Sequence, residues 1–215
     1  LEISFRSDIP LINEANIKGI AINFRRLIKI VPKGLNQSLI SSDPNDIGDA
    51  DGIIFPGQGA CDSAMNNLEE KGLISPISQY VFDNRPFLGL CLGLQLLFDE
   101  SEEGEQPGLG ILRGKVRRFP TSVKIPQIGW NQVKLLDTHP VFNGIASGAY
   151  FYFMHSYYVE PEDTSVILSM TEYGIDFCSA VTRENLCAVQ FHPEKSGVTG
   201  LMFFRGFLKL VESHR

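Results

Sequence analysis

In the first half of the chain, short apolar runs alternate with turn residues and with helical patterns, and this order predicts the sequence of strands and helices. Residues 51–55 and 86–90 are mainly apolar, which is typical of parallel strands that are covered on both faces. Between them, residues 65–72 and 74–82 favour helices, and Gly72 marks the end of the first. Strand, helix and strand in this order predict a parallel crossover unit.

The second half of the chain predicts a series of strands that a helix closes. Residues 150–159 form a long run that is rich in aromatic and β-branched residues and predicts one long strand. In residues 200–211 the apolar positions recur at helical spacing, which predicts an amphipathic helix. Further strands are expected at residues 114–119, 131–135, 166–171, 177–182 and 186–191.

The fold expected from this order is an α/β fold. The first residues predict a strand at 9–12 and a helix whose apolar positions run from Ile17 to Ile28. The chain has 215 residues, enough for one large domain, and no change of composition marks a linker. We therefore expect a single domain over residues 1–215. Its sheet should be doubly wound and mainly parallel, with flanking helices and some antiparallel strands in the C-terminal half.

The composition of the chain argues against some classes of binding partner. The net charge is −6 and no basic face is evident, which argues against nucleic acid. No apolar run approaches the length of a membrane span and the start has no signal-peptide pattern, so we expect no membrane partner. The four cysteines lack the spacing of a metal site and suit a reducing compartment. These features predict a cytoplasmic protein with neither a metal nor another cofactor.

The most informative stretch is Gly89-Leu90-Cys91-Leu92-Gly93, which follows the strand predicted at 86–90 and precedes residues that favour a helix. A nucleophile at the apex of a sharp strand-to-helix turn needs small residues two before and two after it, because strand and helix approach closely there. A helix that begins at this point favours a thiolate at its N-terminus. Cys91 is therefore a candidate nucleophile. The alternative is a buried structural cysteine between two packing glycines.

A candidate base lies near the end of the chain, in His192-Pro193-Glu194. Proline disfavours helix at the residue before it and fixes its own φ, so we expect these three residues to be extended. The side chains of His192 and Glu194 would then point to the same side. A carboxylate beside an imidazole holds its tautomer and stabilises the imidazolium, which is the orienting role in a catalytic triad. In isolation, His192 could also be a structural histidine at a strand end.

Two further stretches are ambiguous by themselves. Pro56-Gly57-Gln58-Gly59 follows a buried strand and could turn backbone N–H groups toward a pocket, but most such sequences are plain turns. Trp130, the only tryptophan, lies in a segment with proline and glycine and is either a core anchor or part of an interface.

Taken together, these motifs resemble the class I, triad-type glutamine amidotransferases, and within them the glutaminase subunits of imidazole glycerol phosphate synthases. The resemblance runs from about residue 43 to the C-terminus. Gln58 stands where the family usually has valine, Gln127 stands where it has histidine, and Asn13-Glu14-Ala15-Asn16 replaces its first glycine-rich turn. The stretches that carry the resemblance are Pro56-Gly57-Gln58-Gly59, the ten residues from Gly89 to Phe98, Gly129-Trp130-Asn131, His155-Ser156-Tyr157-Tyr158, and the eight residues from Gln190 to Gly197.

The resemblance implies a glutaminase with a thiol-ester mechanism. Cys91 would attack the side-chain amide of glutamine, His192 would serve as acid and base, and Glu194 would orient His192. The oxyanion would be held by backbone N–H groups of Leu92 and of the Gly57-Gln58 region. The residues implied for substrate binding are Gly59, Gln95, His155, Ser156 and Tyr157.

The resemblance also implies a partner. In the family, ammonia passes into a (β/α)₈-barrel synthase subunit that makes imidazole glycerol phosphate in histidine biosynthesis, so the expected assembly is a heterodimer. Trp130 is similar in position to interface residues, and Tyr152 and Lys195 to residues at the ammonia gate. One alternative is a paralogous glutaminase that supplies another acceptor, such as a sugar precursor of a polysaccharide. Others are a non-catalytic binding subunit and a cysteine peptidase on a similar scaffold.

Overall fold

The computed structural model of this chain describes residues 28–32, 39–57 and 59–214, with side chains from residue 41 onward. The strand predicted at 9–12 and almost all of the helix predicted between Ile17 and Ile28 lie outside this range. Ile28 itself begins a strand, β1 (Ile28–Pro32), so the predicted helix does not extend to it.

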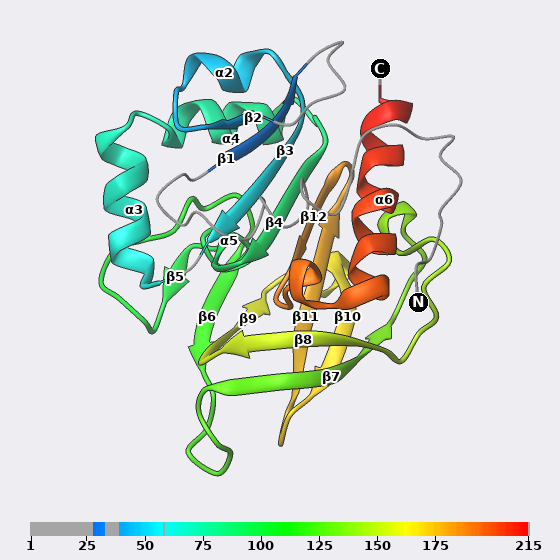
Figure 1. Cartoon of the computed structure of the whole chain (residues 1–215). Helices are drawn as coiled ribbons and strands as arrows, with labels where there is room; N and C mark the ends of the chain where they lie inside the picture. Colours follow the sequence, from blue (N-terminus) through cyan, green and yellow to red (C-terminus); the bar gives the residue numbers. More distant parts are fainter. Residues whose placement is uncertain (1–27, 33–38, 58, 215) are drawn as a thin grey trace.

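The described elements alternate between strands and helices in the first half and are mainly strands in the second (Figure 1). Helix α4 (Ile74–Phe82) has the predicted bounds, whereas α3 (Cys61–Glu70) begins earlier than the periodicity indicated. The other elements, in chain order, are β2 (Leu39–Ser41), α2 (Asn45–Gly48), β3 (Ala50–Gly57), β4 (Phe87–Cys91), α5 (Leu92–Gln95), β5 (Glu100–Ser101), β6 (Gly114–Arg118), β7 (Gln127–Leu135), β8 (Ala149–His155), β9 (Tyr157–Pro161), β10 (Ile167–Glu172), β11 (Asp176–Arg183), β12 (Leu186–Val189) and α6 (Gly197–Ser213), with 3₁₀ turns η1 (Pro140–Phe142), η2 (Thr164–Val166) and η3 (Pro193–Lys195).

The α/β fold is confirmed, with a mixed sheet. Its main path through the described strands runs β2-β1-β3-β4-β12-β11-β10-β7-β8. Strand β4 pairs in parallel with β3 on one side and β12 on the other, whereas the ladders from β12 onward to β8 are antiparallel. The sheet is therefore less parallel than expected, because short turns such as that between β10 and β11 join neighbouring strands as hairpins.

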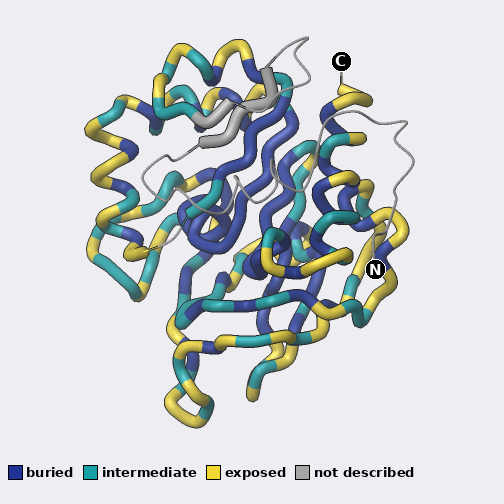
Figure 2. Tube along the Cα trace, in the orientation of Figure 1, coloured by how far each residue is buried: buried dark blue, intermediate teal, exposed yellow. Residues whose placement is uncertain are grey.

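Helices cover both faces of the parallel part of the sheet, and side chains alternate between two cores. Phe55 and Phe87 face the core that α3 and α4 share with the sheet. Leu88 and Val189 point the other way, into the core that α6 covers with Phe203, Phe204 and Phe207. In Figure 2 the strands between these helices are dark blue along most of their length, as expected for strands that read as apolar runs.

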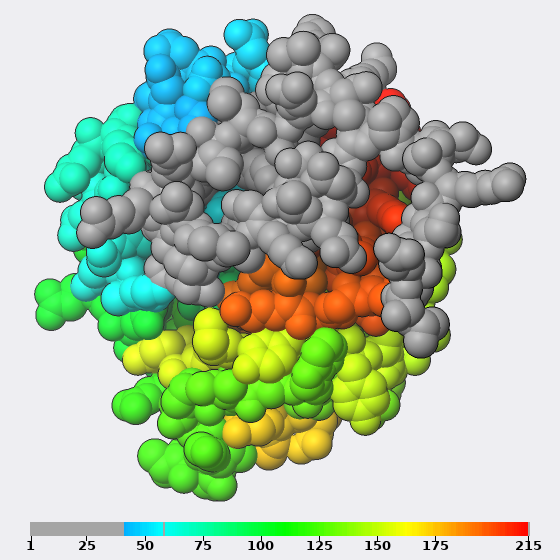
Figure 3. Space-filling view, in the orientation of Figure 1, coloured from blue at the N-terminus to red at the C-terminus, as the bar shows by residue number. Residues whose placement is uncertain are grey.

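The apolar run at 150–159 forms two strands and not the single strand expected. Ser156 interrupts it, and the two parts pair with different neighbours: β8 with β7, and β9 with β6 and β11. A run of aromatic and β-branched residues indicates strand conformation but does not show where the pairing partner changes. Strands β7 and β8 form a ribbon that lies beside η3 and the start of α6, seen as green and yellow atoms below the orange ones in Figure 3.

Candidate active site

The carboxyl ends of β3, β4 and β12 bring the predicted catalytic residues to one edge of the sheet. In the ladder registers, Gly57 lies opposite Cys91 and Val189 lies opposite Leu90. His192 follows β12 by three residues, so it lies at the same edge as Cys91. Open α/β sheets place their sites at such edges.

Cys91 lies at the apex of the expected sharp turn between β4 and α5. Its φ is 54° and its ψ −108°, a conformation that costs a non-glycine residue about 1–3 kcal/mol. The flanking glycines make the turn possible. A Cβ on Gly93 would lie 2.0 Å from the Phe55 carbonyl oxygen, and one on Gly89 would lie 2.9 Å from the Gly93 carbonyl oxygen. The glycine pattern is therefore explained by close packing around a strained cysteine, as the sequence predicted.

The helix after Cys91 is shorter than expected. It spans Leu92–Gln95 and then continues in tighter turns, in which Phe98 N–H donates to the Gln95 carbonyl. All residues from 91 to 98 are buried, so the pattern of apolar positions carries no information on where the helix ends. The macrodipole is a sum over aligned peptides, and four residues supply few of them.

His192 and Glu194 form the predicted pair, but their backbone conformation differs from the expected one. The distance from His192 Nδ1 to Glu194 Oε1 is 2.7 Å, and both side chains are buried. His192 is extended as expected, but Pro193 begins the 3₁₀ turn η3, so the expected extended conformation is wrong for Pro193 and Glu194. A proline at the first position of a helical turn has no N–H to leave unpaired, and its φ suits the turn.

The backbone of His192 is tied to β8 from two sides. Its N–H donates to the Tyr152 carbonyl at 2.8 Å, and its carbonyl accepts from Ser196 Oγ at 2.7 Å. The same Ser196 Oγ accepts from Tyr152 N–H at 3.0 Å. Ser196 thus fixes the position of His192, a role that the sequence reasoning did not assign to it.

The electrostatics favour a charged His192. Burial lowers its pKa, but the interactions with Cys91 and Glu194 outweigh burial and raise the pKa from 6.5 to about 10. Nε2 is buried, faces Cys91 and makes no hydrogen bond of regular geometry with the described residues. This arrangement stabilises an imidazolium when the sulfur carries a negative charge.

Gln95 and Gln190 are joined in a chain of hydrogen bonds that ends on Cys91. Gln95 Nε2 donates to the Tyr157 carbonyl and to Gln190 Oε1, at 3.0 Å each. Gln190 Nε2 in turn donates to Cys91 Sγ at 3.7 Å. Gln95 was among the residues predicted from the sequence and Gln190 was not, although a single amide at the end of an apolar strand was a usable signal.

The predicted substrate-binding segment from His155 to Tyr157 lies beside the site, mainly through its backbone. Tyr157 supplies the carbonyl that Gln95 binds, and the Met154 carbonyl lies 4.0 Å from Cys91 Sγ. The His155 ring is 6 % exposed and packs against Phe177 at a centroid distance of 5.4 Å. Burial lowers the pKa of His155 from 6.5 to about 4, so its ring is neutral near pH 7.

The remaining predicted residues of the loop after β3 are only partly described. Gln58 lies outside the described residues. Gly57 is packed against the turn, since a Cβ there would lie 2.8 Å from Leu92 Cβ. Gly59 is exposed and has a φ of 99°, a conformation that glycine adopts without strain. The oxyanion-hole roles of Gly57, Gln58 and Leu92 stay predictions.

The other three cysteines differ from Cys91 in their surroundings. All three are buried, and burial raises the pKa of each thiol above its usual value, to about 12 for Cys178. Neither Cys61 nor Cys187 has a histidine partner among the described residues. Among the residues that the structure describes, no group of three or more His, Cys, Asp or Glu could hold a metal ion, and no helix is long and apolar enough to cross a membrane.

Trp130 lies on the outer face of the β7–β8 ribbon and is 56 % exposed, which excludes the core-anchor alternative. Its ring packs edge-on against Tyr152 at 5.9 Å. Ile128 and Tyr150 on the same two strands are 60 % and 53 % exposed. Lys195 is exposed in η3, next to the segment that binds the Tyr152 backbone.

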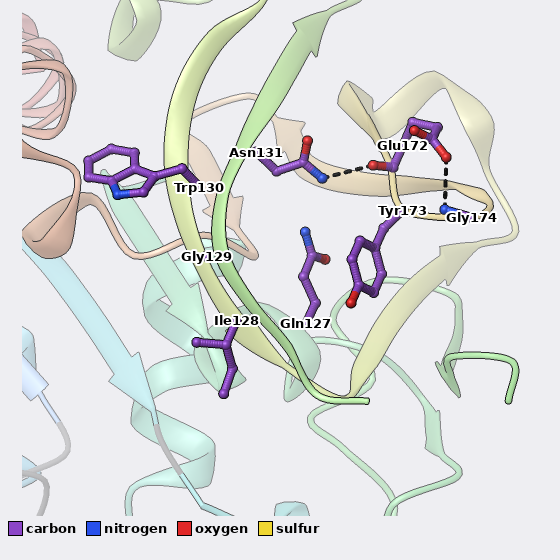
Figure 4. A pocket seen from close by; sticks show the side chains of 8 residues that line it. All are labelled: Gln127, Ile128, Gly129, Trp130, Asn131, Glu172, Tyr173 and Gly174. Atoms are coloured by element: carbon purple, nitrogen blue, oxygen red, sulfur yellow. Dashed lines mark hydrogen bonds between the residues drawn. The ribbon is translucent and has the colours of Figure 1, made fainter. Parts of the chain in front are cut away.

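Gln127 points to the opposite side of the ribbon from Trp130 (Figure 4). It is 3 % exposed and helps to line a hollow of about 320 Å³ together with Tyr173 and Asn131, whose Nδ2 donates to the Glu172 carbonyl. Ile128 and Trp130 also line this hollow, so the replacement of the family's histidine by Gln127 alters a hollow that borders the exposed face around Trp130.

Comparison with known proteins gives matches over most of the chain. Residues 15–210 match the family model of class-I glutamine amidotransferases. A curated relative from Dehalococcoides mccartyi (strain CBDB1), named imidazole glycerol phosphate synthase subunit HisH, is 49% identical over 173 residues, covering 80% of this chain and 84% of the relative. A protein of the same name from Syntrophotalea carbinolica is 45% identical over 193 residues, covering 86% and 94%. A solved glutamine amidotransferase, 20% identical, has a TM-score of 0.62 over 81% of this chain and 87% of its own.

Proposed function

This chain belongs to the class-I glutamine amidotransferase family, and we propose that it is the glutaminase subunit of an imidazole glycerol phosphate synthase. It would hydrolyse glutamine to glutamate and supply the ammonia for imidazole glycerol phosphate synthesis in histidine biosynthesis. The observation that carries the proposal is the strained Cys91 at the apex of its turn, facing the buried His192–Glu194 pair.

The first half-reaction follows from the charge on His192. With a pKa of about 10, His192 is protonated near pH 7, and an imidazolium that faces the sulfur of Cys91 stabilises the thiolate, which is the nucleophilic form. The thiolate attacks the carboxamide carbon of glutamine, and its electron pair forms the C–S bond while the carbonyl oxygen becomes an oxyanion. As the oxyanion collapses, the C–N bond breaks and His192 gives its proton to the leaving nitrogen. The products are a thiol ester on Cys91 and ammonia.

The second half-reaction uses the same imidazole as a base. Once the sulfur is acylated it carries no negative charge, so the contribution of Cys91 to the raised pKa of His192 is lost. Neutral His192 then takes a proton from water, and the hydroxide formed attacks the thiol ester. The C–S bond breaks, glutamate leaves, and the imidazolium and the thiolate are restored. Glu194 stabilises the imidazolium in both steps.

We further propose that a (β/α)₈-barrel synthase subunit docks on the outer face of the β7–β8 ribbon. Ile128, Trp130 and Tyr150 expose apolar surface there, and exposed tryptophan and tyrosine are enriched at protein interfaces. This face continues to Tyr152, whose backbone binds His192 directly. Ammonia released at Cys91 would therefore leave close to the docked partner.

The test of the proposed function follows the amide nitrogen. The chain is combined with the barrel subunit of an imidazole glycerol phosphate synthase and with glutamine labelled with ¹⁵N in its amide, and the imidazole product is analysed by mass spectrometry. Wild-type protein should transfer the label. Cys91→Ser should transfer none, and ammonium chloride should restore product because the barrel reaction itself is intact. Cys61→Ser, a buried cysteine on α3, is the control and should transfer label as wild type does. Label transfer by Cys91→Ser would contradict the mechanism.

A further inference from the structure

Gln190 is a buried polar residue that the mechanism above does not use. It follows the last residue of β12, is 0 % exposed, and its backbone N–H donates to the Ser179 carbonyl on β11 at 2.9 Å. Its backbone is therefore fixed by the sheet while its side chain reaches the site. A fully buried amide is stable only when its polar atoms are paired, so its hydrogen bonds define its role.

The direction of the Gln190 amide is set by a backbone carbonyl. Gln95 binds the Tyr157 carbonyl, which can only accept, so the Gln95 atom that faces it must be the nitrogen. The second N–H of the same nitrogen faces Gln190 at 3.0 Å, so the Gln190 atom at that contact must be the acceptor Oε1. The other end of the Gln190 amide, which faces Cys91 Sγ at 3.7 Å, is therefore the donor Nε2. A flip of the Gln190 amide would bring two donors together, and a flip of the Gln95 amide would bring acceptors together.

We propose that Gln190 is a further catalytic residue of the glutaminase reaction, which donates a hydrogen bond to the sulfur of Cys91 and holds Gln95 in place through its carbonyl oxygen. A donor aimed at the sulfur stabilises the thiolate, because a hydrogen bond to the charged form of a group favours that form. Helix α5 has four residues and supplies little dipole, so a discrete donor matters here. Both N–H groups of Gln95 are occupied, which leaves its oxygen as the end available to substrate.

This proposal rests on the proposed function, but its first test does not need glutamine. The rate at which iodoacetamide alkylates Cys91, measured by mass spectrometry between pH 5 and 10, reports the reactivity of the sulfur whatever the natural substrate is. If the chain failed to hydrolyse glutamine, the proposed function would fail while the alkylation profile still decided the role of Gln190.

Three variants separate the two contacts of Gln190 from its packing. Gln190→Met keeps the shape of the side chain and removes both the donor and the acceptor. Gln190→Glu keeps an acceptor for Gln95 and places a carboxylate beside the sulfur in place of the donor. Ser179→Ala is the control, since it removes a buried hydrogen bond, Ser169 Oγ to Ser179 Oγ at 2.9 Å, without touching Cys91. Thermal unfolding of each variant reports its stability.

In Gln190→Met, alkylation at pH 7 should fall roughly 10-fold and the midpoint of the pH–rate profile should rise by about one unit, as expected for the loss of one hydrogen bond to a charged group. Gln190→Glu should be slowed at least as much at pH 7, through like-charge repulsion. The KM for glutamine should rise in Gln190→Met, which releases Gln95, and stay near the wild-type value in Gln190→Glu.

Either of two results would overturn the proposal. The first is a pH–rate profile of alkylation in Gln190→Met, or in Gln190→Glu if the Met variant does not fold, that coincides with wild type. The second is an equal upward shift in Ser179→Ala, which would assign the effect to general loosening of the sheet.

Discussion

The buried ring of His155 should make the protein lose stability in mildly acid solution. Burial, with a smaller contribution from the charge on His192, lowers its pKa in the folded protein, against the hydrogen bond to the Tyr157 carbonyl, which raises it. The folded pKa is about 4, and the usual value is 6.5. Below pH 6.5 the unfolded chain therefore binds a proton that the folded protein does not, so stability falls as pH falls from about 6.5 toward 4.

The size of the effect follows from the two pKa values. One unit corresponds to about 1.36 kcal/mol, and integration from pH 7.5 down to 4.5 gives a loss of about 2.5 kcal/mol from this one side chain. A typical domain has about 5–15 kcal/mol of unfolding free energy, so the loss should be readily measurable. His192 affects stability in a different pH range. Its pKa is raised, so its stabilising contribution is complete below pH 6.5 and is lost only as pH rises toward about 10.

The assay compares urea unfolding of wild type and His155→Asn at pH 7.5 and at pH 4.5. Asparagine keeps a side-chain N–H for the Tyr157 carbonyl and does not titrate. It also creates a cavity, but that penalty is the same at both pH values. Carboxylates titrate equally in both proteins and cancel in the difference. The stability advantage of wild type over the variant should shrink by about 2.5 kcal/mol at pH 4.5. An advantage that is equal at both pH values would refute a neutral, buried His155.

Two further predictions concern the catalytic pair and the docking face. His192→Ala should lower the rate of glutamate release by roughly 10²–10⁴-fold, and Glu194→Gln should lower it less, because the glutamine side chain can still accept a hydrogen bond from His192 Nδ1. Steady-state kinetics of the two variants shows which loses more activity. A greater loss in Glu194→Gln would mean that Glu194 does more than orient the ring. Trp130→Ala should weaken binding of the barrel subunit at least 10-fold in titration calorimetry. The control is Phe82→Ala on α4, since Phe82 is 66 % exposed and lies outside the ribbon, and this variant should bind as wild type does. Equal affinities of the two variants would place the partner elsewhere.

The strands and turns that carry the nucleophile could be predicted because local chemistry determines them. An apolar run followed by Gly-x-Cys-x-Gly permits few arrangements, and β4 and the turn at Cys91 are as predicted. The pairing of the His192 and Glu194 side chains was also predicted, but the 3₁₀ turn of the backbone that joins them was not. A proline is compatible with an extended chain and with the first position of a 3₁₀ turn, and the bonds of Ser196 to Tyr152 on β8 and to the His192 carbonyl are long-range and local contacts that hold the turn.

The features that could not be predicted depend on contacts between distant segments. The break at Ser156 depends on which strands β8 and β9 pair with, and these partners lie elsewhere in the chain. The role of Gln190 depends on Gln95, which is 95 positions away, and on the Tyr157 carbonyl, which fixes the direction of both amides. A single polar residue in an apolar run indicates that such a partner exists but not which residue it is.

The two buried histidines His155 and His192 differ in their surroundings, and in the proposed mechanism this difference gives the site one imidazole that exchanges protons. Both are buried, so burial alone would keep both neutral. His192 has a carboxylate and the nucleophilic sulfur as neighbours, which raise its pKa to about 10. His155 has aromatic rings and a backbone carbonyl, and its pKa falls to about 4. A second imidazolium near the first would repel it and make protonation of His192 less favourable. In the proposed mechanism, keeping His155 neutral therefore leaves His192 as the group that exchanges protons with the substrate, and the proposed donor from Gln190 stabilises the sulfur without adding a charge that titrates.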